Sequence, residues 1–518
     1  ATRVGPTGLI EKGRENLLLQ SNQFDTTWLT TNASVTSGQS GYDGSSDAWS
    51  LTSTALNGSH RIIQTFTGGS NSIVTYSLFA KSNGYDFLRI VENASTGDFA
   101  TFNLSNGSVI NNTGIADTAT ISSVGNGWYR CSVSVDGGAT TRFDIYTMET
   151  SGATDFLGDG VSGAYIQDAQ VELGLAATDY IESGATTGKA GLLEDEPRFD
   201  YSGGATCPSL LLEPSRTNIV RQSEYIDGYG VKISCTSTPN YGTSPEGLTN
   251  STRLQFTGNG YTYEAIPQVN GTQYTISVYA KRNDSGTQSF GFFVNGSGAI
   301  DSAMALTNEW KRFDYTYTAT NNIYFGFAGN SGADVSVYGF QLEAASYPTS
   351  YIPNHSGGSV TRGKDECTGA GDSSTFNSTE GVLYAEINAL KYPVDVNNWL
   401  TITDGTSANS VAIQFETNGT LSGRIEVGGV SQAYITTSVD YSNFIKVAFK
   451  YKENDFAWWV NGVEVGTDSS GITFPPNTLN SLQFAYGSGS NDWSGNVKQL
   501  LTFNTALSDA DLATLTTL

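Results

Sequence analysis

The chain has few of the residues that build metal, redox and nucleophilic sites. Its 518 residues include four cysteines, two histidines and two methionines. No two cysteines have C-x-x-C spacing, so a zinc site or a redox motif has no support. Cys207 and Cys235 can pair with each other, or all four thiols are free. With two histidines and neither G-x-S-x-G nor H-E-x-x-H, a hydrolytic triad or zinc peptidase is not supported.

Charge is also scarce, and it is mostly of one sign. Charged residues make up 15% of the chain, and acids outnumber bases 50 to 26, for a net charge of −24. Binding of nucleic acid needs clustered lysine and arginine, so we expect no nucleic-acid partner. No apolar run approaches the roughly 18 residues needed to cross a bilayer, so we expect no membrane insertion. This composition suits an extracellular or saline medium.

The N-terminus carries neither a methionine nor a charged-then-apolar signal segment. It reads Ala1-Thr2-Arg3-Val4. We expect residues 1–12 to be a truncated N-terminal connector, with an anchoring region upstream.

Glycine and aromatic residues are abundant. There are 59 glycines, 27 tyrosines, 25 phenylalanines and 8 tryptophans. This mixture favours strands separated by tight turns and supplies enough apolar surface for folding. A chain of this length exceeds one compact core and suits about three domains.

An internal duplication organises the first two thirds of the chain. The string YSLFAK (76–81) returns as YTISVYAK (274–281), with Lys81 matching Lys281. The flanking landmarks repeat in the same order: Asn16 and Asn218, the N-x-W-x-R strings at 126–130 and 308–312, and a Gln-x-(x)-Glu followed by Tyr-Ile at 170–181 and 341–352. Two copies of one domain therefore precede a third, different domain.

These signals divide the chain into six segments. We predict a connector at 1–12, a jelly-roll repeat at 13–184, a connector at 185–214, a second jelly-roll repeat at 215–354, a linker at 355–379 and a third domain at 380–518. Short alternating strands bounded by glycine and asparagine indicate antiparallel sandwiches, so the fold class is all-β. Ser508, followed by Asp509 and Asp511, predicts the N-cap of one C-terminal helix.

Several residues within these elements have structural interpretations. Asn-Gly pairs at 106–107 and 461–462 predict β-hairpins. The matched Trp128 and Trp310 are expected in the cores of the repeats. Lys81 and Lys281 are expected to protect sheet edges from further pairing.

The third domain resembles the laminin-G-like branch of the concanavalin A-like lectin/glucanase superfamily. The resemblance rests on a W-V-N-G hairpin, a G-x-I-x-x-L-x-x-F strand and a terminal L-S-x-x-E/D-L turn, here Trp459–Gly462, Gly495–Phe503 and Leu507–Leu512. It covers the whole predicted third domain. It implies a two-sheet sandwich and says little about the ligand.

The first two thirds are similar to bacteriophage tail, fibre and capsid-decorating proteins that combine carbohydrate-binding-module-like jelly rolls with laminin-G-like domains. The similarity rests on ATRVGPTGLIE, PRFDY and LLLEPSRTN. It implies a non-enzymatic virion protein (a head or tail fibre, spike or decoration) on the virion surface. Its partners would be other capsid or tail proteins and host-surface or environmental glycans, and it would form a homotrimer.

Two alternatives to this interpretation remain. The chain can be the binding modules of a secreted bacterial polysaccharide-active protein whose catalytic module lies upstream. It can also be purely structural.

No catalytic constellation or cofactor motif is found. Glycosidases of the superfamily carry paired acids in an E-x-D-x-(x)-E strand, and Glu416, Glu426 and Glu453 do not have that spacing. The segments 158–160 and 365–372 carry oxygen ligands suited to calcium. They lack the D-x-[DN]-x-[DN]-G pattern, so we interpret them as turns and expect no cofactor.

A glycan site is expected in the third domain. Trp493 stands in a Gly/Ser/Asn loop beside Asn491 and Asp492. An indole face against a pyranose, with amide and carboxylate groups on the hydroxyls, is the chemistry of sugar binding. The alternative is that Trp493 caps the sandwich core. The side chains of Trp458 and Trp459 point to opposite faces of their strand, so one of them lies in the core. We assign Trp458 to the other face, where it would contact a glycan.

Overall fold

A computed structural model describes residues 1–92, 97–138, 141–202, 204, 206–294, 296, 299–320 and 323–518. Strands hold 51% of the chain and helices 2%, which confirms the all-β fold class. The chain folds as two compact units: unit 1 comprises residues 1–2, 9–195 and 217–360, and unit 2 comprises 3–8, 196–216 and 361–518. Among the described residues, no helix has the length and apolar character needed to span a membrane.

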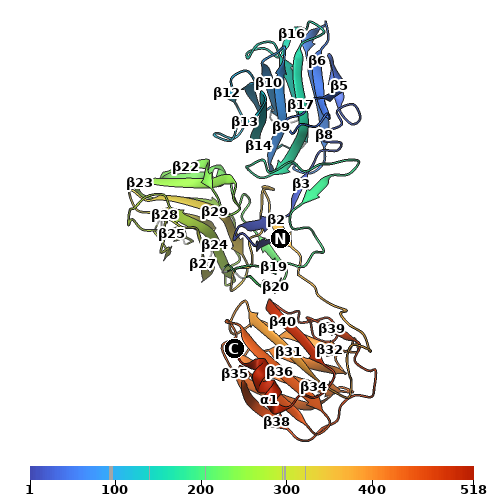
Figure 1. The fold of residues 1–518 in the computed structure, drawn as a ribbon. Coiled ribbons are helices and arrows are strands. Elements are labelled where there is room, and N and C mark those ends of the chain that lie inside the picture. Colours follow the sequence, from blue (N-terminus) through green and yellow to red (C-terminus); the bar gives the residue numbers. More distant parts are fainter. Residues whose placement is uncertain are drawn as a thin grey trace. The chain divides into compact units, whose positions relative to one another are not determined.

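The first repeat is a sandwich of two six-stranded antiparallel sheets (Figure 1), with the orders β12-β11-β10-β15-β8-β4 and β13-β14-β9-β17-β6-β5. Their bounds are β4 (Leu29–Thr31), β5 (Ala33–Gln39), β6 (Ala48–Ser53), β8 (Arg61–Phe66), β9 (Ile73–Asn83), β10 (Phe87–Glu92), β11 (Phe99–Asn103), β12 (Ser108–Asn112), β13 (Thr120–Gly125), β14 (Trp128–Asp136), β15 (Thr141–Met148) and β17 (Gly163–Leu173). Two small ribbons accompany it: β7 (Asn57–Ser59) with β16 (Asp155–Leu157), and β3 (Arg14–Asn16) with β18 (Gly188–Ala190). The segment before the repeat forms β2 (Ile10–Lys12).

The second repeat forms its two layers from one continuous eight-stranded sheet. The strand β23 joins the layers, because Thr252–Gln255 pair with β29 while Gly260–Ala265 pair with β28. The bounds are β22 (Val231–Thr243), β23 (Thr249–Ala265), β24 (Gln273–Arg282), β25 (Phe290–Phe293), β26 (Ser302–Ala303), β27 (Lys311–Thr318), β28 (Tyr324–Gly329) and β29 (Asp334–Glu343), with a 3₁₀ turn at Ile226–Gly228.

The two repeats share their strand registers. Ala80 pairs with Tyr129 and Ala280 with Lys311, which places the two N-x-W-x-R strings at the same level of each sheet. On the other side of these strands, Gln170 pairs with Ser77 just as Gln341 pairs with Ser277. The landmarks that repeat in the sequence therefore occupy equivalent positions in space.

A buried hydrogen-bond clasp explains why these landmarks are polar. The amide of Asn16 donates to the carbonyl of Ile181 at 2.9 Å and accepts from the backbone N–H of Val171 at 3.1 Å. Gln170 donates to Glu172 at 2.6 Å and accepts from the N–H of Ile181 at 2.6 Å. The second repeat builds the same clasp from Asn218, Gln341, Glu343 and Ile352. Each clasp satisfies backbone groups where the closing strand leaves the sandwich.

Unit 2 is a sandwich of a seven-stranded and a five-stranded sheet, with the orders β19-β20-β40-β31-β36-β37-β38 and β35-β34-β33-β32-β39. The bounds are β19 (Phe199–Asp200), β20 (Ser209–Leu212), β31 (Glu380–Ala389), β32 (Asn398–Thr403), β33 (Ser410–Phe415), β34 (Thr420–Val427), β35 (Val430–Ser438), β36 (Ile445–Lys452), β37 (Phe456–Val460), β38 (Val463–Asp468), β39 (Ser481–Gln483), β40 (Gly495–Phe503) and α1 (Asp509–Thr516). The short strands β1 (Thr2–Val4), β21 (Arg216–Asn218) and β30 (Val360–Arg362) lie where the chain passes between units.

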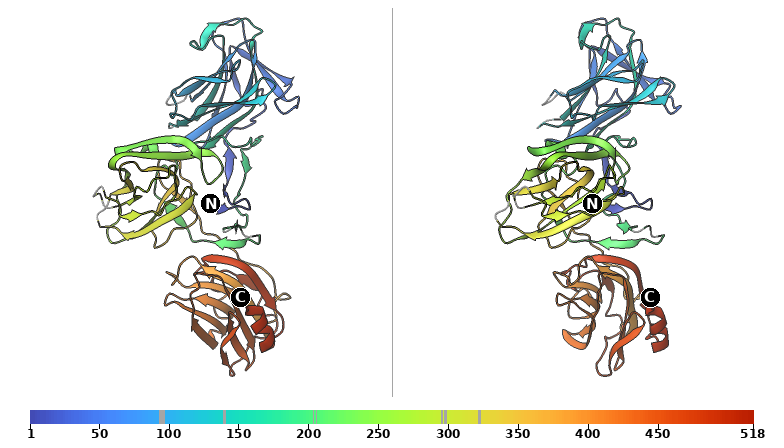
Figure 2. Two further views of the ribbon diagram at one scale, coloured as in Figure 1. Left: turned by 60° about the vertical axis from the view of Figure 1, so that its left-hand side comes forward. Right: turned by 90° about the vertical axis from the view of Figure 1, so that its left-hand side faces the viewer.

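The C-terminal helix covers the outer face of the seven-stranded sheet (Figure 2), where Leu512 and Trp459 belong to one buried cluster. Ser508 accepts a hydrogen bond from the N–H of Asp511 at 3.3 Å, so the predicted N-cap is confirmed. β20 extends the same sheet by pairing with β40, so part of the predicted connector 185–214 is regular structure. The predicted domain boundaries themselves stay predictions.

Some details differ from the sequence predictions. The strands β9 and β24 each have partners on both sides, so Lys81 and Lys281 do not guard a sheet edge, and Lys281 lies over the ring of Trp310 at 5.1 Å. Trp128 is buried as predicted, whereas Trp310 is half-buried and lies just before β27. All four cysteines are free thiols.

Candidate functional site

The two tryptophans predicted to bind sugar are buried, and this part of the prediction is wrong. Trp493 is 1% exposed and packs on Phe415, with ring centroids 4.6 Å apart. Trp458 is fully buried and packs against Phe449 at 6.1 Å. A buried indole cannot offer its face to a pyranose. Trp493 therefore belongs to the core of the sandwich, as the alternative interpretation had it.

The other two predicted residues lie at the surface. Asn491 is exposed and has a positive φ of 53°, which marks a turn position. The carboxylate of Asp492 accepts a hydrogen bond from Lys364 at 3.0 Å. Their role in binding stays a prediction, but the neighbouring indole of Trp493 is not available to stack on a sugar.

The outward face of the five-stranded sheet carries a richer set of groups. Alternate residues of each strand point into the core, among them Leu400, Ile413 and Ile425. The intervening residues face outward, and the register brings them into neighbouring rows: Trp399 and Thr401 (β32), Ser410 and Gln414 (β33), Ser422, Arg424 and Glu426 (β34), Tyr434 (β35) and Gln483 (β39).

Arg424 stands at the centre of this face between aromatic rings. Its guanidinium lies 5.0 Å from the ring centroid of Trp399 and 5.5 Å from that of Tyr434, within cation–π range. It also forms an ion pair with Glu426. Tyr486, which follows β39, packs against Trp399 at 4.4 Å and donates to Glu426 at 3.3 Å. Tyr434 is 50% exposed, so one edge of this aromatic cluster is open to solvent.

Glu416 completes the face at the other end of β33. Tyr434 and Thr420 donate to its two oxygens at 2.6 and 2.8 Å. Burial opposes ionisation, but these hydrogen bonds and the charge of Arg424 outweigh it and lower the pKa of Glu416. Glu416 is therefore ionised and accepts hydrogen bonds at neutral pH.

The two carboxylates of this face are Glu416, which accepts from Thr420 at the start of β34, and Glu426, which lies near the end of that strand. A glycosidase needs one carboxyl that protonates the leaving group and one that acts as a base or nucleophile. Both carboxylates are occupied by hydroxyl or guanidinium donors.

Several polar groups of this face are buried and have no hydrogen-bond partner within the described residues. They are Trp399 Nε1, Ser410 Oγ, Gln414 Oε1, Arg424 Nε and Gln483 Nε2. Buried polar atoms are nearly always paired, so a group of unpaired ones on a single face indicates a place where a polar ligand or ordered water binds.

The sequence contained one usable signal for this face that we did not read. Tyr434 is an aromatic residue between Ala433 and Ile435, and strand alternation turns it outward when they point inward. The strand β35 was not predicted, and without it the outward row from β32 to β35 cannot be assembled.

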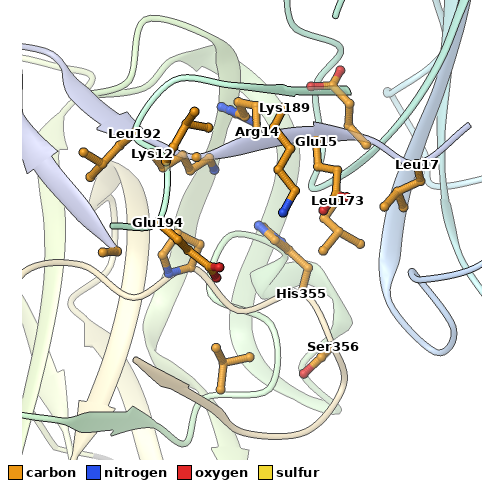
Figure 3. A pocket seen from close by; sticks show the side chains of 16 residues that line it. Lys12, Arg14, Glu15, Leu17, Leu173, Lys189, Leu192, Glu194, His355 and Ser356 are labelled. Carbon is orange, nitrogen blue, oxygen red and sulfur yellow. The ribbon is translucent and has the colours of Figure 1, made fainter. Parts of the chain in front are cut away.

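Unit 1 contains a different polar site, a hollow of about 360 Å³ lined mainly by Lys12, Arg14, Lys189 and His355 with leucine side chains (Figure 3). Two of its cations, Lys12 and Arg14, are already neutralised. Lys12 pairs with Glu224 at 2.9 Å and with Glu246 at 3.0 Å, and Arg14 pairs with Glu246 at 2.9 Å.

Two groups around this hollow, Glu224 and His355, have strongly shifted pKa values. Burial by itself would raise the pKa of Glu224, but Lys12 and nearby cations lower it to about 2. Burial lowers the pKa of His355 to about 4 against the attraction of Glu224, 3.5 Å away. Tyr338 and Tyr351 also donate to Glu224, at 3.1 and 3.0 Å. The network fastens the segment around Lys12 to the second repeat, and we interpret it as structural.

Comparison with known proteins agrees with the fold of unit 2. Residues 383–513 match the concanavalin A-like lectin/glucanases superfamily. With the two-sheet topology described above, this region is a lectin-like β-sandwich. No curated protein matches the chain.

Several solved structures show partial likeness. One is the CBM40 of the Ruminococcus gnavus IT-sialidase bound to alpha2,3 sialyllactose, at 15% identity and a TM-score of 0.25, covering 29% of this chain and 95% of that one. A SAP-like pentraxin from Limulus polyphemus has 14% identity and a TM-score of 0.24, covering 29% and 74%. The CBM22-1 xylan-binding domain of Paenibacillus barcinonensis Xyn10C has 12% identity and a TM-score of 0.20, covering 24% and 91%.

Proposed function

We propose that this chain binds glycans through the outward face of the five-stranded sheet of unit 2. The observation that carries the proposal is the group of buried, unpaired polar atoms on that face, beside the rings of Trp399, Tyr434 and Tyr486. A sugar offers apolar C–H faces and many hydroxyls in one molecule, and this face offers aromatic rings and many polar groups. The lectin-like fold of residues 383–513 supports the same function.

Each group has a stated role in this proposal. The exposed Tyr434 packs against the pyranose. Gln414 Oε1 and Gln483 Nε2 are covered by neighbouring groups, so they bond to the sugar hydroxyls through ordered water. Arg424 holds the aromatic rings of Trp399 and Tyr434 in place. The occupancy of Glu416 and Glu426 by hydroxyl and guanidinium donors supports binding without cleavage.

We further propose that this binding takes place on a virion surface or in another extracellular setting, as part of a trimeric bacteriophage fibre, spike or decoration that contacts capsid or tail proteins. This setting rests on the resemblance of the repeats to such proteins. The binding modules of a secreted bacterial polysaccharide-active protein remain the alternative. Sedimentation of the chain with purified phage particles would favour the first, and a soluble form joined to a catalytic module the second.

Glycan-array binding followed by isothermal titration tests the site itself. Tyr434→Ala should weaken binding of the array's best ligand at least ~10-fold, equivalent to about 1.4 kcal/mol. Tyr241→Ala, a tyrosine of similar exposure in unit 1, is the matched control and should bind like the wild type. Equal affinity of the Tyr434→Ala variant and the wild type would exclude this face as the site.

A further inference from the structure

The two repeats present the same sheet face with different side chains. In the first repeat, β8, β15 and β10 place Arg61, Tyr146 and Arg89 in one outward row. In the second repeat, the registers of β23, β28 and β25 put Tyr261, Ala328 and Gly291 in the matching row. The next rows are Ile63, Asp144 and Val91 in the first copy and Tyr263, Gly326 and Phe293 in the second.

The face of the first repeat is charged, and its charges are paired. Asp144 is buried and lies 3.0 Å from Arg61 and 2.7 Å from Arg142. Arg89 lies over the ring of Phe99 at 4.2 Å. These contacts fill the sheet surface with groups that satisfy one another.

The face of the second repeat is uncharged and aromatic. Tyr261 and Phe293 have ring planes within 17° at 5.2 Å, and Tyr261 and Tyr263 within 22° at 5.9 Å. Tyr324 adds a ring 4.7 Å from Tyr263. The three tyrosines are half-buried rather than covered, so their rings are accessible along the sheet.

Small residues leave the sheet surface beside these rings without protruding side chains. A Cβ on Gly326 would lie 2.1 Å from the carbonyl oxygen of Thr262, and one on Gly291 would lie 2.0 Å from that of Ser302. No side chain can therefore rise from these positions. A hollow of about 560 Å³ continues from this floor, and its lining combines Ala303, Ala328 and Gly329 with the polar Asn259, Ser289, Asp301 and Asn330.

We infer that the second repeat carries a second, independent binding site for an uncharged oligosaccharide. The inference rests on the proposed glycan-binding function. The tyrosines stack on the apolar faces of successive sugar rings, and the asparagine and serine groups around the hollow bond to their hydroxyls. No cation faces the site from the described strands, and Asp301 lies at its rim, so sugars that carry carboxylate or sulfate are disfavoured.

The test uses the full chain and neutral hexaoses as probes: cellohexaose, xylohexaose, laminarihexaose and maltohexaose, with hexagalacturonate as the acidic probe. Titration calorimetry should find at least one neutral hexaose whose affinity falls 10-fold or more in Tyr261→Ala/Tyr263→Ala. The same affinity should be unchanged in Tyr434→Ala, which alters the other site, and in the control Tyr241→Ala. Hexagalacturonate should show no tyrosine-dependent binding in the second repeat.

A second variant distinguishes loss of the binding site from loss of folding. Ser289 is exposed at the rim of the hollow, so Ser289→Trp obstructs the site without changing the core, and it should also weaken the hexaose at least 10-fold. If Tyr434-dependent binding persists and no hexaose depends on Tyr261, Tyr263 or Ser289, the second site is overturned and the proposed function stands. If binding depends neither on Tyr434 nor on the residues of the second repeat, the proposed function and the second site are both overturned. If the variants change the mass of the assembly in light scattering instead, the aromatic face joins copies of the chain, and the inference is wrong.

Discussion

The two repeats close their sandwiches with the same hydrogen bonds, but the side chains next to those hydrogen bonds differ. Each uses one asparagine and one Gln-x-(x)-Glu pair to close the sandwich. Matched hydrogen bonds have matching lengths, as at Ile181 (2.9 Å from Asn16) and Ile352 (2.9 Å from Asn218). Beside the clasp the copies differ. Six residues after that asparagine, the first repeat has Asn22 and the second has Glu224, the buried centre of an ion network. The comparison separates what the fold requires from what each copy has added.

The largest expected effect comes from removing the feature that only the second repeat has. Glu224→Ala leaves the buried Lys12 with only one of its two carboxylate partners and removes the acceptor of Tyr338 and Tyr351, which costs about 3–5 kcal/mol. The matched Asn22→Ala removes one long hydrogen bond to the carbonyl of Asp47 and one from the N–H of Asp168, and should cost about 1 kcal/mol. Scanning calorimetry of the full chain measures both. Equal losses would mean that the network adds nothing to the shared framework.

The next effect should be the same in both copies. Asn16→Ala and Asn218→Ala each remove a buried amide and leave backbone N–H and C=O groups unpaired, which costs about 2–3 kcal/mol. Denaturant unfolding of the two variants should give losses within about 1 kcal/mol of each other. A copy that tolerates its substitution does not depend on the clasp, and the structural equivalence of the repeats would then be superficial.

Acid should weaken the second repeat through His355. Its folded pKa of about 4 lies below the ordinary 6.5, so the unfolded chain takes up the proton first and stability falls as pH drops from 6.5 to 4. Glu224, with a folded pKa of about 2, adds a further loss below pH 4.5. Between pH 7 and 5, the wild type should therefore lose about 2 kcal/mol more than His355→Gln. Parallel pH profiles of the two proteins would show that His355 does not titrate as its burial implies.

The smallest effect has the opposite sign and belongs to the first repeat. Burial raises the pKa of Asp168 to about 7, so its protonated form stabilises the fold at low pH and this contribution is lost as pH rises from 4 through 7. From pH 5 to 6 the wild type should lose about 1 kcal/mol more than Asp168→Asn. Burial also raises the pKa of Glu264 to about 7, but that group is present in both proteins and cancels. The difference in melting temperature at the two pH values measures the effect.

Local signals predicted much of this architecture. The Asn-Gly pair at 461–462 forms the turn between β37 and β38 with positive φ at both residues, and Ser508 caps the only α-helix of the described chain. Turn and cap chemistry acts within a few residues, so it can be read without knowledge of the fold. The G-x-I-x-x-L-x-x-F string was likewise predicted as a strand, and it is β40.

The candidate site was harder to predict, because no local property decides which aromatic residue is exposed. Trp493 has the composition of a sugar-binding loop around it, yet its ring fills the core against Phe415. Tyr434 and Arg424 lie on separate strands and become direct partners through the register of β34 and β35. The face depends on which strands pair and which side of the sheet is covered.

By itself, the sequence determined that this protein is all-β, duplicated and poor in catalytic groups, because composition, alternation and repeated landmarks are local or additive properties of the chain. The tertiary structure alone decided which side chains meet. It paired β20 with β40, which lie far apart in the sequence, buried Trp458 and Trp493, and gathered the unpaired polar groups of β32, β33, β34 and β39 on one face. The reason is that burial and register arise from contacts between distant segments, and a ligand binds only what those contacts leave exposed.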